Sequence, residues 1–306
     1  MANWNDLPDE IKMLIIKKMK FTTRNKLKMC SRLDRVMVNN IPLKFGDVHT
    51  LISKNELSMS VNDSANSILF QIKNSEPNTL EVVFNGTTRY IPYSTFEEGR
   101  QIVNQYAISF LATIFYARNV EIGDFITGIA FPIEFMNAIN KPKCDRIEVR
   151  YSSSVNIKNW MEHFTTTEFI IDELSSPDEI VDDPDTLDML MNYDWLDMEV
   201  PNGLTDDHLM NFNGRVIWLG SSNVTSIGIN SFIKKVIADD DQNSKMIDFG
   251  FEMKDKLWWN EVIQEIRCKH FERNFLGFEH EITNGKYLYL TTCEFRIVIS
   301  KKKNFE

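Results

Sequence analysis

The sequence predicts an α/β protein in which three short N-terminal helices precede an irregular series of strand–helix–strand units. In the first 45 residues the apolar positions recur at helical spacing, whereas further on short β-like runs alternate with longer helical segments. A chain of 306 residues with 43% hydrophobic and 25% charged residues has the composition of a globular protein. We expect a small helical domain at 1–45 and a larger domain at 46–306.

The first helix is predicted to begin at Leu7-Pro8-Asp9-Glu10, because Pro fits a first turn and the two acids complement its positive end. Its apolar positions are Ile11, Leu14, Ile15, Ile16 and Met19. A second helix, capped by Thr22 or Thr23, is expected to carry Leu27, Cys30 and Leu33, and Val36 begins a third segment. So short a unit buries little surface, and we expect it to dock on something larger.

Beyond residue 45, strand candidates alternate with helix candidates. The strand candidates are 80–85, 146–151, 168–171, 215–219, 246–251, 287–291 and 295–299, and the helix candidates are 96–118, 156–164, 227–238 and 258–269. Because 146–171 and 215–251 each have the order strand, helix, strand, we expect right-handed β-α units with parallel strands. Their irregular spacing favours a degenerate, leucine-rich-repeat-like arc over a regular solenoid.

The net charge of −10 is unevenly distributed. Residues 159–214 contain no Lys or Arg and 15 acids, whereas residues 1–45 contain ten Lys or Arg and four acids. An acidic chain of this kind argues against general nucleic-acid binding. An acidic insertion at about 172–210 either captures a basic segment of a partner protein or forms a solvated loop. Its candidate substrate-binding residues are Asp182, Asp183, Asp185, Asp188 and Trp195.

No motif in the sequence indicates catalysis. It lacks a phosphate-binding loop, a dinucleotide fingerprint, a zinc-protease motif and a nucleophile elbow, and its five histidines and four cysteines are dispersed. We therefore expect no catalytic residue, no metal site, no cofactor and no enzymatic activity. Asp239-Asp240-Asp241 either binds a cation or, as we favour, closes a helix as a polar loop.

Three features of the sequence indicate where the protein is located. The cysteines form no CxxC pair, the N-terminus has no secretory signal pattern, and the longest apolar run, 106–117, has only 12 residues. A membrane helix needs about 20 apolar residues. Reduced thiols are typical of cytosolic or nuclear proteins. We expect a soluble protein of the cytoplasm and/or nucleus with no membrane partner.

The N-terminal helical unit carries a recognisable pattern. Its residues are Trp4, Leu7-Pro8-Asp9-Glu10-Ile11, Ile15-Ile16, Met19, Leu27, Cys30-Ser31, Leu33 and Val36. The pattern resembles an F-box, the short helical module by which substrate receptors dock on the Skp adaptor within cullin-RING ubiquitin ligases. With Arg24, Lys26 and Lys28 it is most similar to the large nematode-expanded F-box families.

The resemblance implies that nine residues bind the Skp-family adaptor: Leu7, Pro8, Ile11, Ile15, Met19, Leu27, Cys30, Leu33 and Val36. A helical unit too small to hide its apolar faces suits a partner surface, and the alternative is that Leu7, Ile11, Ile15, Leu27 and Val36 pack on the rest of the chain. Many F-boxes place a Trp after the Cys of the second helix. Here Leu33 occupies that neighbourhood, which reduces the area buried against an adaptor.

The C-terminal third resembles the type 2 F-box-associated region of nematode proteins, through 205–219, 227–235 and the strand at 246–251. The sequence departs from that pattern at Val236-Ile237, where a Trp commonly follows the Phe-Ile-Lys core. Together the resemblances imply a substrate-recognition subunit of an SCF (Skp-cullin-F-box) ubiquitin ligase, which binds a target protein for ubiquitination and degradation. The alternative is an interaction scaffold that assembles no ligase.

Overall fold

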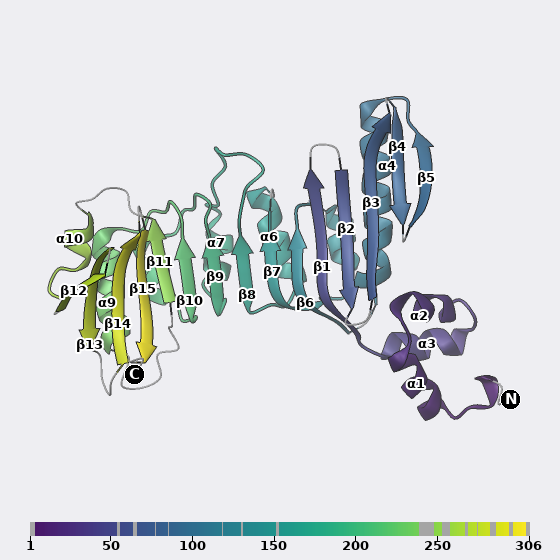
Figure 1. Cartoon of the computed structure of the whole chain (residues 1–306), viewed down its shortest axis with the longest axis horizontal. Coiled ribbons are helices and arrows are strands. Elements are labelled where there is room, and N and C mark those ends of the chain that lie inside the picture. Colours follow the sequence, from purple (N-terminus) through teal and green to yellow (C-terminus); the bar gives the residue numbers. More distant parts are fainter. Residues whose placement is uncertain are drawn as a thin grey trace. The chain divides into compact units, whose positions relative to one another are not determined.

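The computed structural model describes residues 4–53, 56–63, 66–76, 78–84, 86–117, 119–129, 131–150, 153–238, 248–252, 258–266, 269–273, 275–281, 286–293 and 296–303. The chain forms two compact units (Figure 1). Unit 1 comprises Met1–Asp145 and Asn159–Thr165, and unit 2 comprises Arg146–Lys158 and Thr166–Glu306. Strand β7 (Lys143–Val149) and helix α6 (Ser154–His163) contribute residues to both units. N-terminal helices followed by strands and helices confirm the predicted α/β class.

Unit 1 begins with four short helical elements, η1 (Trp4–Asp6), α1 (Asp9–Lys18), α2 (Phe21–Leu27) and α3 (Arg32–Asn40). Pro8 precedes α1, and two acids occupy its first turn as the sequence predicts. The predicted boundaries of the next helices were wrong. Lys20 rather than Thr22 or Thr23 precedes α2, and the chain turns after Leu27.

Ser31 starts α3 because its hydroxyl accepts a hydrogen bond from the backbone N–H of Asp34 at 3.0 Å. Leu33 and Val36 therefore lie together on α3, rather than on a second helix and a separate third segment. A small core of Ile16, Met37, Val38 and Ile41 holds the helices together.

Unit 1 continues with strands in the spatial order β6-β1-β2-β3-β4-β5. Their bounds are β1 Leu43–Ser53, β2 Glu56–Asp63, β3 Asn66–Glu76, β4 Thr79–Phe84, β5 Thr87–Pro92 and β6 Val120–Thr127. Strands β1 to β5 form an antiparallel meander, and β6 pairs in parallel with β1. Of these strands, the sequence predicted only β4.

Helix α4 (Phe96–Phe115) lies on one face of this meander (Figure 1). The ring of Phe110 on α4 stacks on Phe70 of β3, with 5.4 Å between ring centroids. After β6, helix α5 (Ile133–Ala138) closes an aromatic cluster. In this cluster Phe125 packs against Phe115, Trp160 and Phe164 with centroid distances of 5.1 to 5.5 Å.

Unit 2 contains parallel strands that follow one another in chain order. Residues 146–149 of β7 pair with β8, β8 with β9, β9 with β10 and β10 with β11, all in parallel. The bounds are β8 Glu168–Ile171, β9 Trp195–Met198, β10 Val216–Leu219 and β11 Asp248–Glu252. The predicted parallel arrangement of 146–171 and of 215–251 is confirmed.

An antiparallel extension continues the sheet of unit 2 beyond β11 in the order β15, β14, β13 and β12. These strands span β12 Lys269–Arg273, β13 Phe275–Glu281, β14 Lys286–Cys293 and β15 Arg296–Lys303. The predicted helix at 258–269 was wrong in its second half. Helix α10 spans only Trp258–Val262, and Lys269 already belongs to a strand.

The helices of unit 2 cover one face of its parallel strands. They include α7 Pro184–Leu190, α8 Asp206–Asn211, α9 Ser226–Ala238 and α10, and Figure 1 shows α7 behind the parallel strands. Phe249 of β11 meets Phe232 of α9 at a centroid distance of 5.1 Å. Alternate residues such as Phe169, Leu196 and Ile217 are fully buried under these helices.

The acidic segment 172–210 holds regular structure, because α7, β9 and the start of α8 lie within it. A solvated loop therefore does not describe it.

Asp239-Asp240-Asp241 lies outside the described residues. Within the described part of the chain, no helix is long and apolar enough to cross a membrane. Over the same residues, no group of His, Cys, Asp or Glu side chains is placed to hold a metal ion.

Candidate functional site

Helix α1 has two apolar faces with different surroundings. Ile16 is fully buried in the small core of the three helices, whereas Ile11, Leu14 and Ile15 on the other side are 41%, 56% and 37% exposed. On α3, Val38 is buried while Leu33 and Val36 are 53% and 51% exposed. We call Ile11, Leu14, Ile15, Leu33 and Val36 the exposed apolar set.

None of the nine residues predicted to bind an adaptor is buried. Leu7, Met19 and Leu27 are half-buried, and Met19 and Leu27 flank the small core. Pro8, Ile11, Ile15, Cys30, Leu33 and Val36 are exposed. The alternative that Ile11, Ile15 and Val36 pack on the rest of the chain is not what the structure shows. The nine predicted residues do not include Leu14 and Met29, which are also exposed. Leu14 could have been predicted, because it lies three residues after Ile11 and therefore on the same side of the helix.

Asp34 organises the helices from within and was not singled out by the sequence. It is only 5% exposed, and its carboxylate accepts hydrogen bonds from the indole N–H of Trp4 at 2.8 Å and the hydroxyl of Ser31 at 2.7 Å. A buried carboxylate needs such partners. The Ser-x-x-Asp spacing before an apolar run was the available signal.

Arg24 also has a structural role. Its guanidinium donates to the carbonyls of Lys17 at 2.7 Å, Met19 at 3.1 Å and Pro42 at 3.3 Å, and so closes the end of α1 onto the segment before β1. Burial and then the charge of Arg24 lower the pKa of Lys28. Arg24, one of the basic residues in this part of the chain, thus stabilises the fold through these hydrogen bonds.

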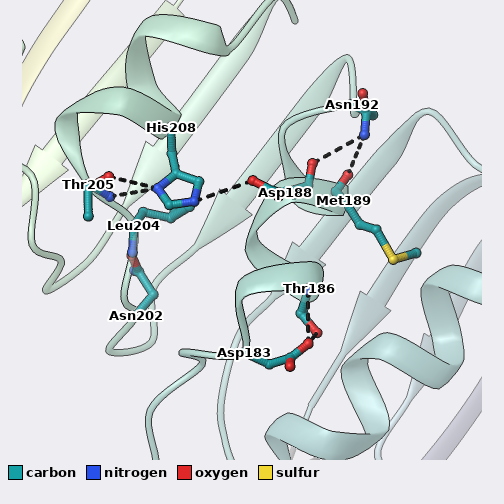
Figure 2. A network of polar contacts seen from close by, with 9 residues as sticks. All are labelled: Asp183, Thr186, Asp188, Met189, Asn192, Asn202, Leu204, Thr205 and His208. Carbon is teal, nitrogen blue, oxygen red and sulfur yellow. Dashed lines mark hydrogen bonds and ion pairs between the residues drawn. The ribbon is translucent and has the colours of Figure 1, made fainter.

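The aspartates of α7 that were predicted to bind a substrate form hydrogen bonds and ion pairs with other residues of the same chain. Asp183 caps α7 by accepting hydrogen bonds from the backbone N–H and the hydroxyl of Thr186 at 3.0 and 2.7 Å (Figure 2). The Thr186 hydroxyl, then its backbone N–H, lowers the pKa of Asp183. Asp185 forms an ion pair with Lys158 at 2.9 Å, and Lys158 also lies 3.6 Å from Asp183.

Asp188, at the other end of α7, faces His208 of α8 (Figure 2). The Nδ1 atom of His208 accepts a hydrogen bond from the backbone N–H of Thr205 at 3.2 Å, which leaves Nε2 to carry the ring proton. That Nε2 lies 3.6 Å from Asp188. The structure thus does not bring the four predicted aspartates together as one open surface. Asp182 remains exposed, and Trp195 lies on β9 with 37% of its surface exposed.

A pocket of about 790 Å³ lies where the chain enters β8, β9 and β10. Its walls include Tyr193, Asp194, His208 and Arg215. The Arg215 guanidinium donates to the Asp194 carboxylate at 2.6 Å, and burial raises the pKa of the Tyr193 hydroxyl, which keeps it neutral. The pocket walls thus carry the carboxylates of Asp188 and Asp194 beside Arg215 and His208.

With this geometry in place, comparison with known protein families gives one match. Residues 4–46 match the F-box domain, so the helices with the exposed apolar set are an F-box domain. F-box domains generally bind a Skp-type adaptor in SCF complexes, and this chain is assigned that class of module. No curated protein matches the chain, and neither does any solved structure.

Proposed function

We propose that this chain is the substrate-recognition subunit of an SCF ubiquitin ligase. The F-box domain binds a Skp-family adaptor and, through it, a cullin-RING ligase. The domain at 46–306 binds a target protein, which is then ubiquitinated and degraded. F-box proteins are generally non-catalytic adaptors, and the chain acts without a cofactor of its own.

The observation that carries the proposal is the exposed apolar set in the matched F-box. Large apolar side chains that remain half exposed on two helices mark a protein-interaction surface. Each such side chain contributes roughly 1.5–3 kcal/mol when fully buried. The basic residues of this part of the chain favour an acidic adaptor surface, which mainly accelerates association.

Co-purification of the full chain with a recombinant Skp-family adaptor tests adaptor binding. We expect a stoichiometric complex with the wild-type chain and its loss with Ile11→Asp combined with Leu33→Asp, since both side chains are exposed and their substitution spares the small core. Phe96→Asp is the matched control, because Phe96 is 79% exposed on α4 outside the F-box. A complex that survives Ile11→Asp with Leu33→Asp as well as it survives the control contradicts the proposal.

For target binding, we propose that the parallel β-α units of unit 2 act as a leucine-rich-repeat-like surface in the cytoplasm and/or nucleus. Consecutive parallel strands with helices on one face support this reading of the unit. The resemblance to nematode type 2 regions is part of the same proposal. Substrate capture with the adaptor site disabled by Leu7→Ala and Pro8→Ala, compared with the wild-type chain, identifies targets that accumulate when degradation is blocked.

The second candidate is an interaction scaffold that assembles no ligase. The same unit 2 surface would serve it. Reconstitution with adaptor, cullin and RING protein separates the two, because ubiquitin transfer to a captured target occurs only for a ligase subunit. A chain that captures its target but binds no adaptor is the scaffold.

A further inference from the structure

The pocket of about 790 Å³ in unit 2 is lined by residues from two sets of elements. Asp188 and Asn192 come from α7 and the residues after it, and His208 comes from α8. Asp194 and Arg215 are the residues immediately before β9 and β10. Ligand-binding pockets usually have volumes of roughly 300–1,000 Å³, so this cavity is large enough to hold a side chain of a partner protein with its flanking backbone.

The side of the pocket formed by the strand entries is held in place by backbone packing. A Cβ at Gly214 would lie closer than 3.0 Å to the carbonyl oxygens of Tyr193 and Asp194, so glycine lets the two segments approach this closely. The backbone N–H of Asp194 donates to the carbonyl of Thr167 at 2.9 Å. The Tyr193 ring stacks on Phe169 of β8 with 5.1 Å between centroids. A pocket that is already formed loses less conformational freedom when a ligand binds.

The asparagines of the lining offer oxygen atoms rather than N–H groups. The side-chain amide of Asn192 donates to the carbonyls of Asp188 at 3.2 Å and Met189 at 3.3 Å. Because carbonyls only accept, these contacts identify the amide nitrogen, and Figure 2 shows the amide oxygen turned away from α7. The amide of Asn213 likewise donates to the carbonyl of Asn211 at 2.9 Å, which leaves its oxygen as an acceptor.

The two carboxylates of the lining add further acceptors. Asp188 lies 3.6 Å from Nε2 of His208, which is too long for a hydrogen bond, and its side chain is 81% exposed. Asp194 accepts from Arg215 through Oδ2 at 2.6 Å, so Oδ1 can accept from a ligand. The His208 ring is neutral in the tautomer whose Nδ1 accepts from Thr205. With two carboxylates and one guanidinium, the lining has an excess of one negative charge.

We infer that this pocket binds a basic side chain of the target protein, a guanidinium or an ammonium group. Such cations only donate hydrogen bonds, and the lining presents acceptors on Asp188, Asp194, Asn192 and Asn213. Lys235 of α9, whose ammonium binds a backbone carbonyl at the end of α8, is not part of the lining. Of the four aspartates predicted from the sequence, only Asp188 lines the pocket. The inference rests on the proposed function, because it takes the occupant to belong to the recruited target.

The test uses the full chain and a positional-scanning array of N-acetylated nonapeptides. The expected result is one position at which Arg or Lys is strongly preferred. The best nonapeptide, measured by fluorescence anisotropy, should bind the variant Asp188→Asn about tenfold more weakly than the wild type, because a charge-assisted hydrogen bond is lost. Asn211→Lys, which places a cation at an exposed position of the lining, should weaken binding by at least about tenfold.

The matched control is Asp185→Asn on the same helix. Its side chain is 79% exposed, it pairs with Lys158 and it does not line the pocket, so the variant removes the same charge outside the site. It should bind the peptide within about twofold of the wild type. Equal urea midpoints of Asp188→Asn and Asp185→Asn show that both variants are folded to the same extent.

Three results overturn the inference: an array without a basic preference, a control that weakens binding as much as Asp188→Asn, or binding that requires a free N-terminal amine in place of the acetyl group. Adaptor binding by the same samples reports on the proposed function separately, because the F-box is unchanged in every variant. A chain that binds the adaptor but shows no basic preference contradicts the inference alone. A chain that prefers basic peptides but binds no adaptor contradicts the proposed function.

Discussion

Gly228, the third residue of α9, gives the sharpest stability prediction, since replacing it by Ala should have the opposite sign to the usual effect. Gly→Ala within a helix ordinarily stabilises by about 0.5–1 kcal/mol. Here a Cβ at Gly228 would lie closer than 3.0 Å to the carboxylate of Asp206. That carboxylate accepts hydrogen bonds from the backbone N–H and the hydroxyl of Thr225, each at 2.7 Å.

The cost follows from the contacts that Ala would displace. The Thr225 hydroxyl accepts a hydrogen bond from the backbone N–H of Gly228 at 3.1 Å and caps α9. Loss of a cap costs about 1 kcal/mol, and hydrogen bonds to a charged group are worth about 1.5–3 kcal/mol each. Counting the loss of the cap and of one of the two hydrogen bonds, and subtracting the helix-propensity gain, we expect Gly228→Ala to lower the free energy of unfolding by about 2–3 kcal/mol.

Urea unfolding followed by tryptophan fluorescence measures this change, and hydrogen exchange at the start of α9 locates it. The control is a double-mutant cycle with Asp206→Ala, which removes the obstructing carboxylate. In that background Gly228→Ala should stabilise by about 0.5–1 kcal/mol. An equal effect of Gly228→Ala in both backgrounds, or stabilisation of the otherwise wild-type chain, would refute the clash with Asp206.

Three further substitutions are expected to have measurable effects. Asp34→Ala leaves the partly buried indole N–H of Trp4 without its acceptor and should destabilise the F-box by about 1–3 kcal/mol, seen as faster hydrogen exchange in α3. Asp183→Ala should lower stability at neutral pH, because the hydrogen bonds from Thr186 depress the pKa of Asp183 below its ordinary 3.8. The stability from a depressed pKa is present above 3.8 and lost as pH falls through the folded-state value, so wild-type and variant urea midpoints should converge in acid and stay apart at pH 7. Phe110→Ala removes a ring stacked on the meander and should cost about 3 kcal/mol in urea unfolding; an unchanged midpoint would show that α4 does not depend on that contact.

Four of the five parallel strands of unit 2 were predictable, because they are short apolar runs next to helices of clear period, whereas β9, inside the acidic segment, was not predicted. The strand Glu168–Ile171 matches its prediction residue for residue, and α9 differs by one residue from 227–238. Phe, Ile, Val and Leu are concentrated in these short runs, which makes them conspicuous as strands.

Strands β1, β2 and β3 of the antiparallel meander escaped prediction because each buries one face only. In β2 the residues Leu57, Met59 and Val61 are buried while Ser58 and Ser60 are partly exposed, a two-residue period diluted by polar side chains. That alternation was available in the sequence. Strand β5 offers no alternation at all, since nearly all of it is exposed and only pairing with β4 makes it a strand.

The candidate sites were also predictable only in part. The apolar residues of the F-box were recognisable by type and spacing, but both sides of α1 are apolar, so only packing distinguishes buried Ile16 from exposed Ile15. The acids of α7 were conspicuous as a run. Their engagement by Lys158 and Thr186 depends on tertiary neighbours that charge counting does not reveal.

The alternation of covered and uncovered residues along β8, β9 and β10 divides the residues of each strand into two sets with different surroundings. Phe169, Leu196 and Ile217 pack against the helices. Ile170 and Trp218 lie on the opposite face of the sheet. A change at an outward position such as the half-buried Ile170 leaves in place the residues buried under the helices. A library randomised only at the outward positions that are exposed or half-buried should therefore yield chains that still fold cooperatively in urea unfolding.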